Sequence, residues 1–361
     1  MLKKNHNLIL NSLGLGELRS KSITDKSNFM DAKSKKVVVI TGASAGLGRA
    51  IVREFAKKGD DIALIARGID GLEAAKKEVE SYGGRALVLP LDVADADAIE
   101  KAATEVEEKL GPIDVWVNNA MNSVFSPIKD MKPDEYKRVT DVTYLGQVYG
   151  ALSALKRMRA RNSGCIIFIG SALAYRGIPL QSAYCAAKHA VEGFYDSFRC
   201  ELLHDKLNIR TCMVQLPAMN TTQFGFVRNK LFYKPKPMGM IYDPEIAAKA
   251  VVFVTEHDRR EIYVGWPTLE AIIGNKILPG YADLHLAKTG YEGQFTKKPE
   301  DPNRKDNLWE PLPGDHGAHG PFTAQSHSFS PQLWVSMHRQ LLATCFAGLA
   351  LTLGAAMLFK K

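Results

Sequence analysis

The sequence predicts an α/β protein whose core is a doubly wound parallel sheet. Between residues 34 and 265, short strand-like runs alternate with amphipathic helical stretches. The strand-like runs are almost entirely apolar, as in 37–40 (VVVI), which is typical of strands covered by helices on both faces. A content of 46% hydrophobic and 24% charged residues is that of an ordinary globular protein, so the chain can bury a large core.

The elements of this core follow one another without long interruptions. We expect strands at 37–40, 62–66, 85–89, 115–117, 165–170, 210–215 and 261–265. We expect helices at 49–58, 71–82, 94–110, 136–160, 184–204 and 244–255. Right-handed connections between successive parallel strands would place helices on both faces of one sheet.

Three segments lie outside this core. Residues 1–33 have no clear period, and we expect a mobile N-terminal extension. Residues 266–335 are rich in Pro, Gly and His and predict an irregular extension packed on or beside the core. Its two neighbouring histidines, His316 and His319, have no carboxylate or cysteine at ligand spacing, so we expect no metal site.

Residues 336–361 predict an apolar C-terminal helix. The stretch from Leu341 to Phe359 has no charged residue and is flanked by basic residues. As a helix it would be about 28 Å long, close to the hydrocarbon thickness of a bilayer. The segment therefore favours a membrane anchor, and a buried helix in the core or in a dimer interface remains the alternative.

Charge and cysteine content narrow the environment of the protein. The formal net charge of +8 could attract nucleic acid, an anionic membrane surface or a phosphorylated cofactor. The chain has no nucleic-acid motif, which favours the latter two. Its five cysteines are odd in number and none has metal-ligand spacing, so we expect reduced thiols and a catalytic domain facing the cytosol. A soluble cytoplasmic protein is the alternative.

A glycine-rich turn after the first strand predicts a dinucleotide site. Residues 41–48 read TGASAGLG and open the first helix. Glycine allows close approach of a pyrophosphate, and the helix N-terminus offers unpaired N–H groups to it. The candidate cofactor residues in this turn are Gly42, Ser44, Gly46, Leu47 and Gly48.

The ends of the next strands refine the cofactor assignment. Arg67 follows the second strand, where an acidic residue would bind ribose hydroxyls and repel a 2′-phosphate, so we favour NADP(H) over NAD(H). Asp92, which precedes Val93, could accept a hydrogen bond from adenine or cap the helix near Ala94. Further candidate cofactor residues are Val93, Asn119 and Ala120.

Three residues form a candidate catalytic group. Tyr184 and Lys188 are four residues apart and share one face of a predicted helix, and Ser171 precedes Tyr184 by thirteen residues. With the glycine turn and the NNA stretch at 118–120, these residues stand in the order and at the spacing of the short-chain dehydrogenase/reductase family. The chain between residues 34 and 265 resembles that family.

The resemblance implies a Rossmann-like fold and a hydride-transfer mechanism. Lys188 would lower the pKa of Tyr184 and hold the nicotinamide ribose, and Tyr184 would exchange a proton with the substrate oxygen. Ser171 would hydrogen-bond that oxygen. Pro217 and Thr221 would contact the cofactor. The family also implies a homo-oligomer paired through the helices at 136–160 and 184–204.

Two residues depart from the family pattern. Thr143 replaces an Asn that fixes a helix bend and a water linked to the lysine. Its hydroxyl could still bind a water, so we expect a changed proton relay rather than an inactive site. Met121 replaces a Gly and would narrow the space near the nicotinamide. Both departures leave the rate and the substrate size open.

The region at 223–242 corresponds to the family's mobile substrate lid. Its apolar residues favour a bulky, apolar substrate, with ordinary core packing as the alternative. They are Phe224, Phe226, Phe232, Tyr233, Met238 and Met240.

The favoured hypothesis is an NADP(H)-dependent oxidoreductase that interconverts a carbonyl and an alcohol on a lipophilic small molecule. A catalytically weak cofactor-sensing or scaffold protein of the same fold is the alternative, because Thr143 and Met121 depart from the pattern. A family member that catalyses epimerisation or dehydration is the third hypothesis.

Overall fold

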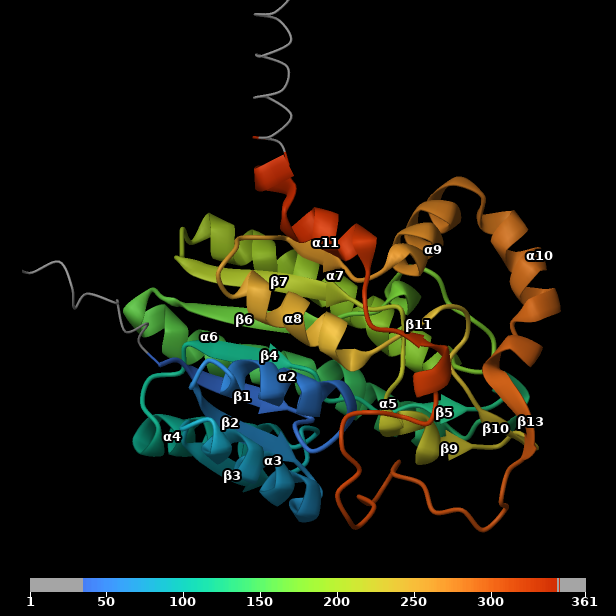
Figure 1. Cartoon of the computed structure of the whole chain (residues 1–361), viewed down its shortest axis with the longest axis horizontal. Coiled ribbons are helices and arrows are strands. Elements are labelled where there is room, and N and C mark those ends of the chain that lie inside the picture. The colour runs from blue at the N-terminus through green and yellow to red at the C-terminus, as the bar shows by residue number, and fades with distance from the viewer. Residues whose placement is uncertain (1–34, 343, 345–361) are drawn as a thin grey trace, which may run out of the picture. The chain divides into compact units, whose positions relative to one another are not determined.

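The computed structural model describes residues 35–342 and residue 344. The predicted N-terminal extension, and all but the beginning of the predicted C-terminal helix, lie outside the described residues. The described chain is the α/β protein that the sequence predicts (Figure 1).

A parallel sheet of seven strands forms the centre of the fold. Its strand order is β12-β7-β6-β4-β1-β2-β3, and every neighbouring pair is parallel. The strands are β1 (Val37–Thr41), β2 (Asp61–Ala66), β3 (Ala86–Pro90), β4 (Val115–Asn118), β6 (Gly164–Ile169), β7 (Ile209–Gln215) and β12 (Glu261–Tyr263). The order reverses direction between β1 and β4, and in open α/β sheets a ligand binds at the carboxyl ends of the strands beside such a point.

Helices cover both faces of the sheet (Figure 1). On one face the buried apolar cluster includes side chains of α2 (Gly46–Ala56), α3 (Ile69–Ser81) and α8 (Pro244–Val254). On the other face it includes side chains of α4 (Ala96–Lys109), α6 (Gly146–Arg161) and α7 (Ser182–His204). The two clusters explain why the strands carry so few polar residues.

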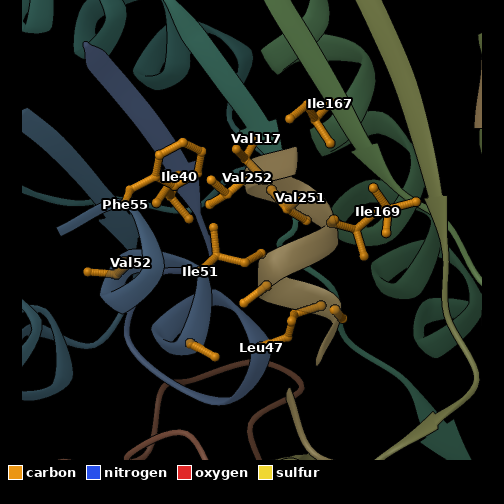
Figure 2. Packing of buried hydrophobic residues seen from close by; sticks show 14 of the residues in the cluster. Ile40, Leu47, Ile51, Val52, Phe55, Val117, Ile167, Ile169, Val251 and Val252 are labelled. Carbon is orange, nitrogen blue, oxygen red and sulfur yellow. The ribbon is translucent and has the colours of Figure 1, made fainter. Parts of the chain in front are cut away.

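Alternate residues of each strand enter alternate clusters. Val38 and Ile40 of β1 lie in the cluster under α2 and α8, whereas Val37 and Val39 lie in the other. Figure 2 shows the first cluster, in which Ile51 of α2 and neighbouring residues of α8 pack over the strands. Full burial of one such side chain stabilises the fold by about 1.5–3 kcal/mol.

The predicted helix at 136–160 has an unexpected middle. The chain is helical through α5 (Pro133–Thr140) and α6, but residues Asp141–Leu145 between them form a π-helical turn. A π turn inserts one extra residue into the helix and often marks a functional site. Thr143, one of the two departures from the family pattern, lies in this turn and is fully buried.

The extension at 266–335 is less irregular than the sequence predicts. It begins with two helices, α9 (Trp266–Ile277) and α10 (Pro279–Thr289). Each helix has a proline in its first turn, where the missing N–H costs nothing. The prolines of this segment suggest an irregular chain in the sequence, but two of them lie in the first turns of helices.

Short strands, one more α-helix and several single 3-10 turns complete the described chain. The strands are β5 (Val124–Phe125), β8 (Ala218–Met219), β9 (Arg228–Asn229), β10 (Tyr233–Pro235), β11 (Ile241–Tyr242), β13 (Phe295–Pro299) and β14 (Ser326–His327), and the helix is α11 (Pro331–Met337). Within the part of the chain that the structure describes, no helix is both long enough and apolar enough to cross a bilayer.

Candidate functional site

A cavity of about 250 Å³ lies at the carboxyl ends of the central strands, next to the glycine turn. Most of the predicted site residues line it together. They are Gly42, Ser44, Gly46, Leu47, Gly48, Arg67, Asp92, Val93, Asn119, Ala120, Tyr184, Lys188 and Thr221. Ser171 and Pro217 are not among the lining residues: Ser171 is 6% exposed, and Pro217 follows β7.

The glycine turn leaves no room for side chains. Gly42 and Gly46 have φ angles of +68° and +56°, which favour glycine. A Cβ on Gly48 would come within 1.9 Å of the Gly42 carbonyl oxygen. The turn therefore brings bare backbone to the start of α2, whose first N–H groups have no partner within the helix.

Hydrogen bonds join the glycine turn to the end of the neighbouring strand β4. The Thr41 hydroxyl accepts hydrogen bonds from the backbone N–H groups of Asn119 and Ala120, at 2.9 and 3.0 Å. The Asn119 side chain donates to the Thr41 carbonyl at 2.9 Å. Asn119 thus holds two strand ends together at the floor of the cavity.

Arg67 has partners that the sequence does not reveal. Its guanidinium donates to the carbonyl oxygens of Asn307 and Trp309, at 2.5 and 2.6 Å. Burial lowers the pKa of this side chain from its ordinary value. The residue that we expect to bind a phosphate is therefore held by the C-terminal extension.

Asp92 does not cap the following helix. Asp95 is the N-cap of α4, and its carboxylate accepts from Ala98 N–H at 3.0 Å. One Asp92 oxygen accepts from the N–H of Ala94 at 3.0 Å, and the other pairs with Arg138 at 2.5 Å. Asp92 thus lines the cavity with both carboxylate oxygens already engaged.

Ser171, Tyr184 and Lys188 come together from two elements. Ser171 follows β6 and accepts at its hydroxyl from Leu173 N–H at 3.1 Å, while Tyr184 and Lys188 lie in the first turns of α7. The Lys188 ammonium donates to the Ile169 carbonyl at 2.6 Å and lies 5.6 Å from the centre of the Tyr184 ring. The Ser171 hydroxyl lies near enough to the Tyr184 phenol to favour a lower pKa for that group.

The protonation equilibria of this group differ from the expectation. Burial raises the pKa of Tyr184, and the nearby Ser171 hydroxyl offsets only part of that rise. Burial also lowers the pKa of Lys188 to about 7. The polypeptide alone therefore does not lower the pKa of Tyr184, because the same burial that shields the phenol also disfavours the lysine charge.

Thr143 is committed to a backbone contact. Its hydroxyl donates to the Asn122 carbonyl at 2.9 Å and accepts from Asn122 N–H at 3.0 Å. With its one proton used in this way, the hydroxyl can accept a hydrogen bond from a water but cannot donate one to it. Gln147 instead reaches the Ile169 carbonyl at 3.4 Å, the same oxygen that Lys188 contacts.

Gln215, like Gln147, is a buried polar residue that sequence reasoning missed. Its side-chain oxygen accepts from Ser171 N–H at 2.8 Å, and its amide donates to Glu192 at 2.9 Å. Gln215 ends strand β7 and is fully buried. A polar amide at the carboxyl end of this strand is the sequence signal that could have drawn attention to it.

The predicted lid residues divide among different environments. Phe226 lines the cavity, whereas Phe224 packs edge-on between Phe125 and Phe322 in a separate buried cluster. Phe232 is 73% exposed. Ordinary packing therefore accounts for Phe224. Met121 lines the cavity, as the predicted narrowing of the space near the nicotinamide requires.

Histidines and cysteines of the described chain have ordinary surroundings. His316 contacts the Phe226 ring, and His319 pairs with Glu245 at 3.0 Å. Among the residues that the structure describes, no group of three or more His, Cys, Asp or Glu could hold a metal ion. Cys165, Cys185, Cys200 and Cys212 are free thiols.

Comparison with known proteins identifies relatives of the chain. A family model described as short chain dehydrogenase matches residues 36–230. The uncharacterized oxidoreductase YxnA of Bacillus subtilis is 30% identical over 302 residues, which are 83% of this chain and 85% of that protein. The 3-dehydrosphinganine reductase of Danio rerio is 33% identical over 60% of this chain and 67% of its own length.

Solved structures give the same result. An alcohol dehydrogenase from the archaeon Thermococcus sibiricus, complexed with 5-hydroxy-NADP, is 27% identical with a TM-score of 0.56. A metagenomic short-chain oxidoreductase in complex with NADP is 28% identical with a TM-score of 0.55. The matches cover 64% of this chain and 96% and 98% of those chains, so this protein carries additional chain beside the shared domain.

Proposed function

This chain belongs to the short-chain dehydrogenase/reductase family and is an NAD(P)-dependent oxidoreductase, and from that premise we propose that it interconverts a carbonyl and an alcohol on a lipophilic small molecule. The observation that carries this proposal is the meeting of Ser171, Tyr184 and Lys188 beside a cavity that begins at the glycine turn. Each of these side chains has a distinct task in such a reaction.

The residues that line the cavity suit a nicotinamide dinucleotide. The bare backbone at Gly42 and Gly48 admits close approach of a pyrophosphate, and the N-terminus of α2 offers donors to it. Arg67, at the end of β2, supports a preference for NADP(H), because its planar, permanently charged group suits a 2′-phosphate. The cofactor, when bound, would exchange a hydride with the substrate.

The three catalytic residues would act on the substrate oxygen. Tyr184 donates a proton to that oxygen during reduction and accepts one during oxidation. Ser171 donates a hydrogen bond to the same oxygen, because its other contact, with Leu173, uses only an oxygen lone pair. Lys188 would donate hydrogen bonds to the ribose hydroxyls in addition to its present acceptor, the Ile169 carbonyl.

Apolar side chains support a lipophilic substrate. Those lining the cavity include Met121, Val142, Leu216, Met219 and Phe226. One relative, from Danio rerio, is named as a reductase of 3-dehydrosphinganine. An apolar cavity wall would exclude water from the reacting group and favour a bulky ketone or alcohol.

A membrane location would agree with such a substrate. The described helices α9 and α10 carry exposed apolar side chains, and α9 contacts the 3-10 turn that follows Ser171. They include Trp266, Ile273, Ile277, Tyr281 and Leu284. Together with the apolar segment 341–359 of the sequence, they support the proposal of a membrane-anchored protein.

Oxidation of NADPH and NADH by purified protein, measured against a panel of apolar ketones and aldehydes, tests the function. We expect turnover with NADPH, and we expect Arg67→Asp to weaken NADPH binding far more than NADH binding. Equal losses for both cofactors would contradict the NADP(H) preference. Binding of NADPH without turnover on any panel member would favour the alternative, a cofactor-sensing protein.

A further inference from the structure

A segment of the C-terminal extension crosses the cofactor cavity. We call residues 306–320 the strap; it belongs to the chain between β13 and α11, coloured orange to red in Figure 1, and lies outside the region that the family model matches. Pro311, Leu312, Gly314 and His316 of the strap line the cavity. The strap is therefore an addition to the shared domain that lies over the proposed cofactor site.

Both ends of the strap are fixed to the core. At its start, Asp306 pairs with Arg228 at 2.9 Å, and the Leu308 side chain is fully buried in an apolar cluster. At its end, Gly320 N–H donates to the Asn220 carbonyl at 3.2 Å. The start of the strap is held by an ion pair and by burial, and its end is held by a backbone hydrogen bond.

One of these contacts uses a donor of the glycine turn. The N–H of Gly46, the first residue of α2, donates to the carbonyl oxygen of Gly317 at 2.9 Å. In a dinucleotide fold, the N–H groups at this helix end are the donors offered to phosphate oxygens. The Gly317 carbonyl oxygen therefore accepts from a donor that a phosphate oxygen of the cofactor would otherwise use.

A second contact uses the cation proposed to select NADP(H). Two strap carbonyls, those of Asn307 and Trp309, accept from the Arg67 guanidinium. A 2′-phosphate would need the same donors, since a guanidinium binds phosphate through the same N–H groups. The strap thus occupies donors at two places in the site, about where the pyrophosphate and the 2′-phosphate are expected.

Two carboxylates hold the middle of the strap in this position. Asp70, in the first turn of α3, accepts from the N–H of Gly314 at 2.6 Å. Asp315 of the strap pairs with Arg49 of α2 at 3.1 Å. Asp70 lies at the surface and Asp315 is 44% exposed, whereas the Arg49 side chain is 2% exposed.

We infer that the strap is a gate that competes with the cofactor: its carbonyl oxygens occupy Gly46 N–H and the Arg67 guanidinium, and the dinucleotide enters only after the strap opens. This inference rests on the cofactor site proposed above. Opening consumes part of the binding free energy, so the apparent affinity falls by the fraction of molecules in the open state. Interactions that hold the strap closed would thereby set the affinity and the rate of NADPH binding.

A reversible cross-link tests the gate. A Cβ built on Gly68 lies 3.5 Å from the Pro311 Cβ, a separation that a disulfide bridges. In the double variant Gly68→Cys/Pro311→Cys, we expect the oxidised protein to bind NADPH at least about tenfold more slowly than the same protein after reduction. Stopped-flow nicotinamide fluorescence measures the rate. The two single-cysteine variants, treated with the same oxidant, control for modification of the exposed Cys200.

Equal binding rates in the oxidised and reduced double variant would overturn the gate while leaving the cofactor site intact. Absence of NADPH binding in the wild-type, single-cysteine and reduced proteins alike would overturn the cofactor assignment, and the gate with it. The reduced protein carries the same two side chains as the oxidised one, so a difference between them reports the covalent link alone.

A loosened strap provides a second test that needs no oxidation. Asp70→Ala/Asp315→Ala removes both carboxylate contacts, and we expect faster NADPH association and a Kd several-fold lower than that of the wild type. Glu73→Ala, which removes an exposed carboxylate from the same helix α3, is the matched control. Weaker NADPH binding with faster release in the double variant would show that the strap stabilises the bound cofactor, which contradicts competition.

Discussion

At the scale of single residues, the most informative group is Lys188. Its side chain is 1% exposed and its ammonium contacts one backbone carbonyl, so burial holds its pKa near 7. Burying this charge lowers the free energy of unfolding. Functional sites often contain such destabilising groups, and the rest of the fold offsets them. Burial also raises the pKa of Tyr184, but this phenol is neutral near pH 7 in both the folded and the unfolded chain and so carries no such cost.

The lysine makes stability depend on pH in a defined direction. Between about pH 7 and the ordinary value of 10.5, the unfolded chain binds more protons at Lys188 than the native protein does. Stability from this group therefore rises with pH through that window, by at most about 1.4 kcal/mol per pH unit, and below pH 7 the native state bears the full cost of the buried charge. We expect Lys188→Met to be more stable than the wild type at pH 6, with a smaller margin at pH 9.

Urea unfolding without cofactor at pH 6, 7.5 and 9 measures this margin. A difference between variant and wild type that stays constant over the three pH values would contradict the assignment of a lowered pKa to Lys188.

Residue types that determine the chemistry were predictable from the sequence, but their partners were not. The spacing of Tyr184 and Lys188 follows from helix geometry, and the structure brings both to the cavity. Arg67, however, meets carbonyls about 240 residues away along the chain, and Asp92 meets Arg138. Backbone carbonyls carry no sequence signature, so such contacts cannot be predicted from a single chain.

At the scale of elements, the glycine turn shows how strictly backbone geometry limits sequence. Gly48→Ala would place a methyl group 1.9 Å from the Gly42 carbonyl oxygen, so the turn or α2 must shift. We expect a loss of more than about 3 kcal/mol in the free energy of unfolding, as for other severe overpacking. Chemical denaturation with circular dichroism measures it.

Gly193, an exposed glycine within α7, provides the matched control. A Cβ there meets nothing within 4 Å. Gly193→Ala should therefore stabilise the protein by about 0.5–1 kcal/mol, because alanine has the better helix propensity. Similar effects of the two substitutions would contradict the packing described for the glycine turn.

The periodicity of the sequence predicted the alternation of strands and helices, and the exceptions have local causes. The π turn at Thr143 depends on a side-chain contact with the backbone of Asn122, which no periodic pattern reveals. Helices α9 and α10 begin at prolines and bury few residues, so they lack the strong apolar face that identifies a packed helix.

At the scale of the whole molecule, the chain combines a family domain with additions at its C-terminal side. The family model ends at residue 230, and the strap and helices α9–α11 follow it. Family resemblance therefore predicted the core and the catalytic group but gave no information about the strap. We expect a homo-oligomer paired through α6 and α7, by analogy with the family.

Deletion of residues 340–361 tests the proposed membrane location. Because this segment contains the apolar stretch, we expect the truncated protein to move from the membrane fraction to the soluble fraction of cells, while it still binds NADPH. Replacement of 341–359 by an unrelated apolar segment of equal length should restore the membrane location. An unchanged distribution of the truncated protein would contradict the anchor.

The central claim is that Tyr184 is the proton donor and acceptor of an NADP(H)-dependent oxidoreductase. The most direct measurement is the kcat of Tyr184→Phe relative to the wild type, with saturating NADPH and the best ketone of the panel, alongside Tyr82→Phe as a surface control. We predict a fall in kcat of about 10²- to 10⁴-fold, with the Kd for NADPH changed less than about twofold and the control unaffected. A Tyr184→Phe protein that keeps the wild-type kcat would contradict the mechanism.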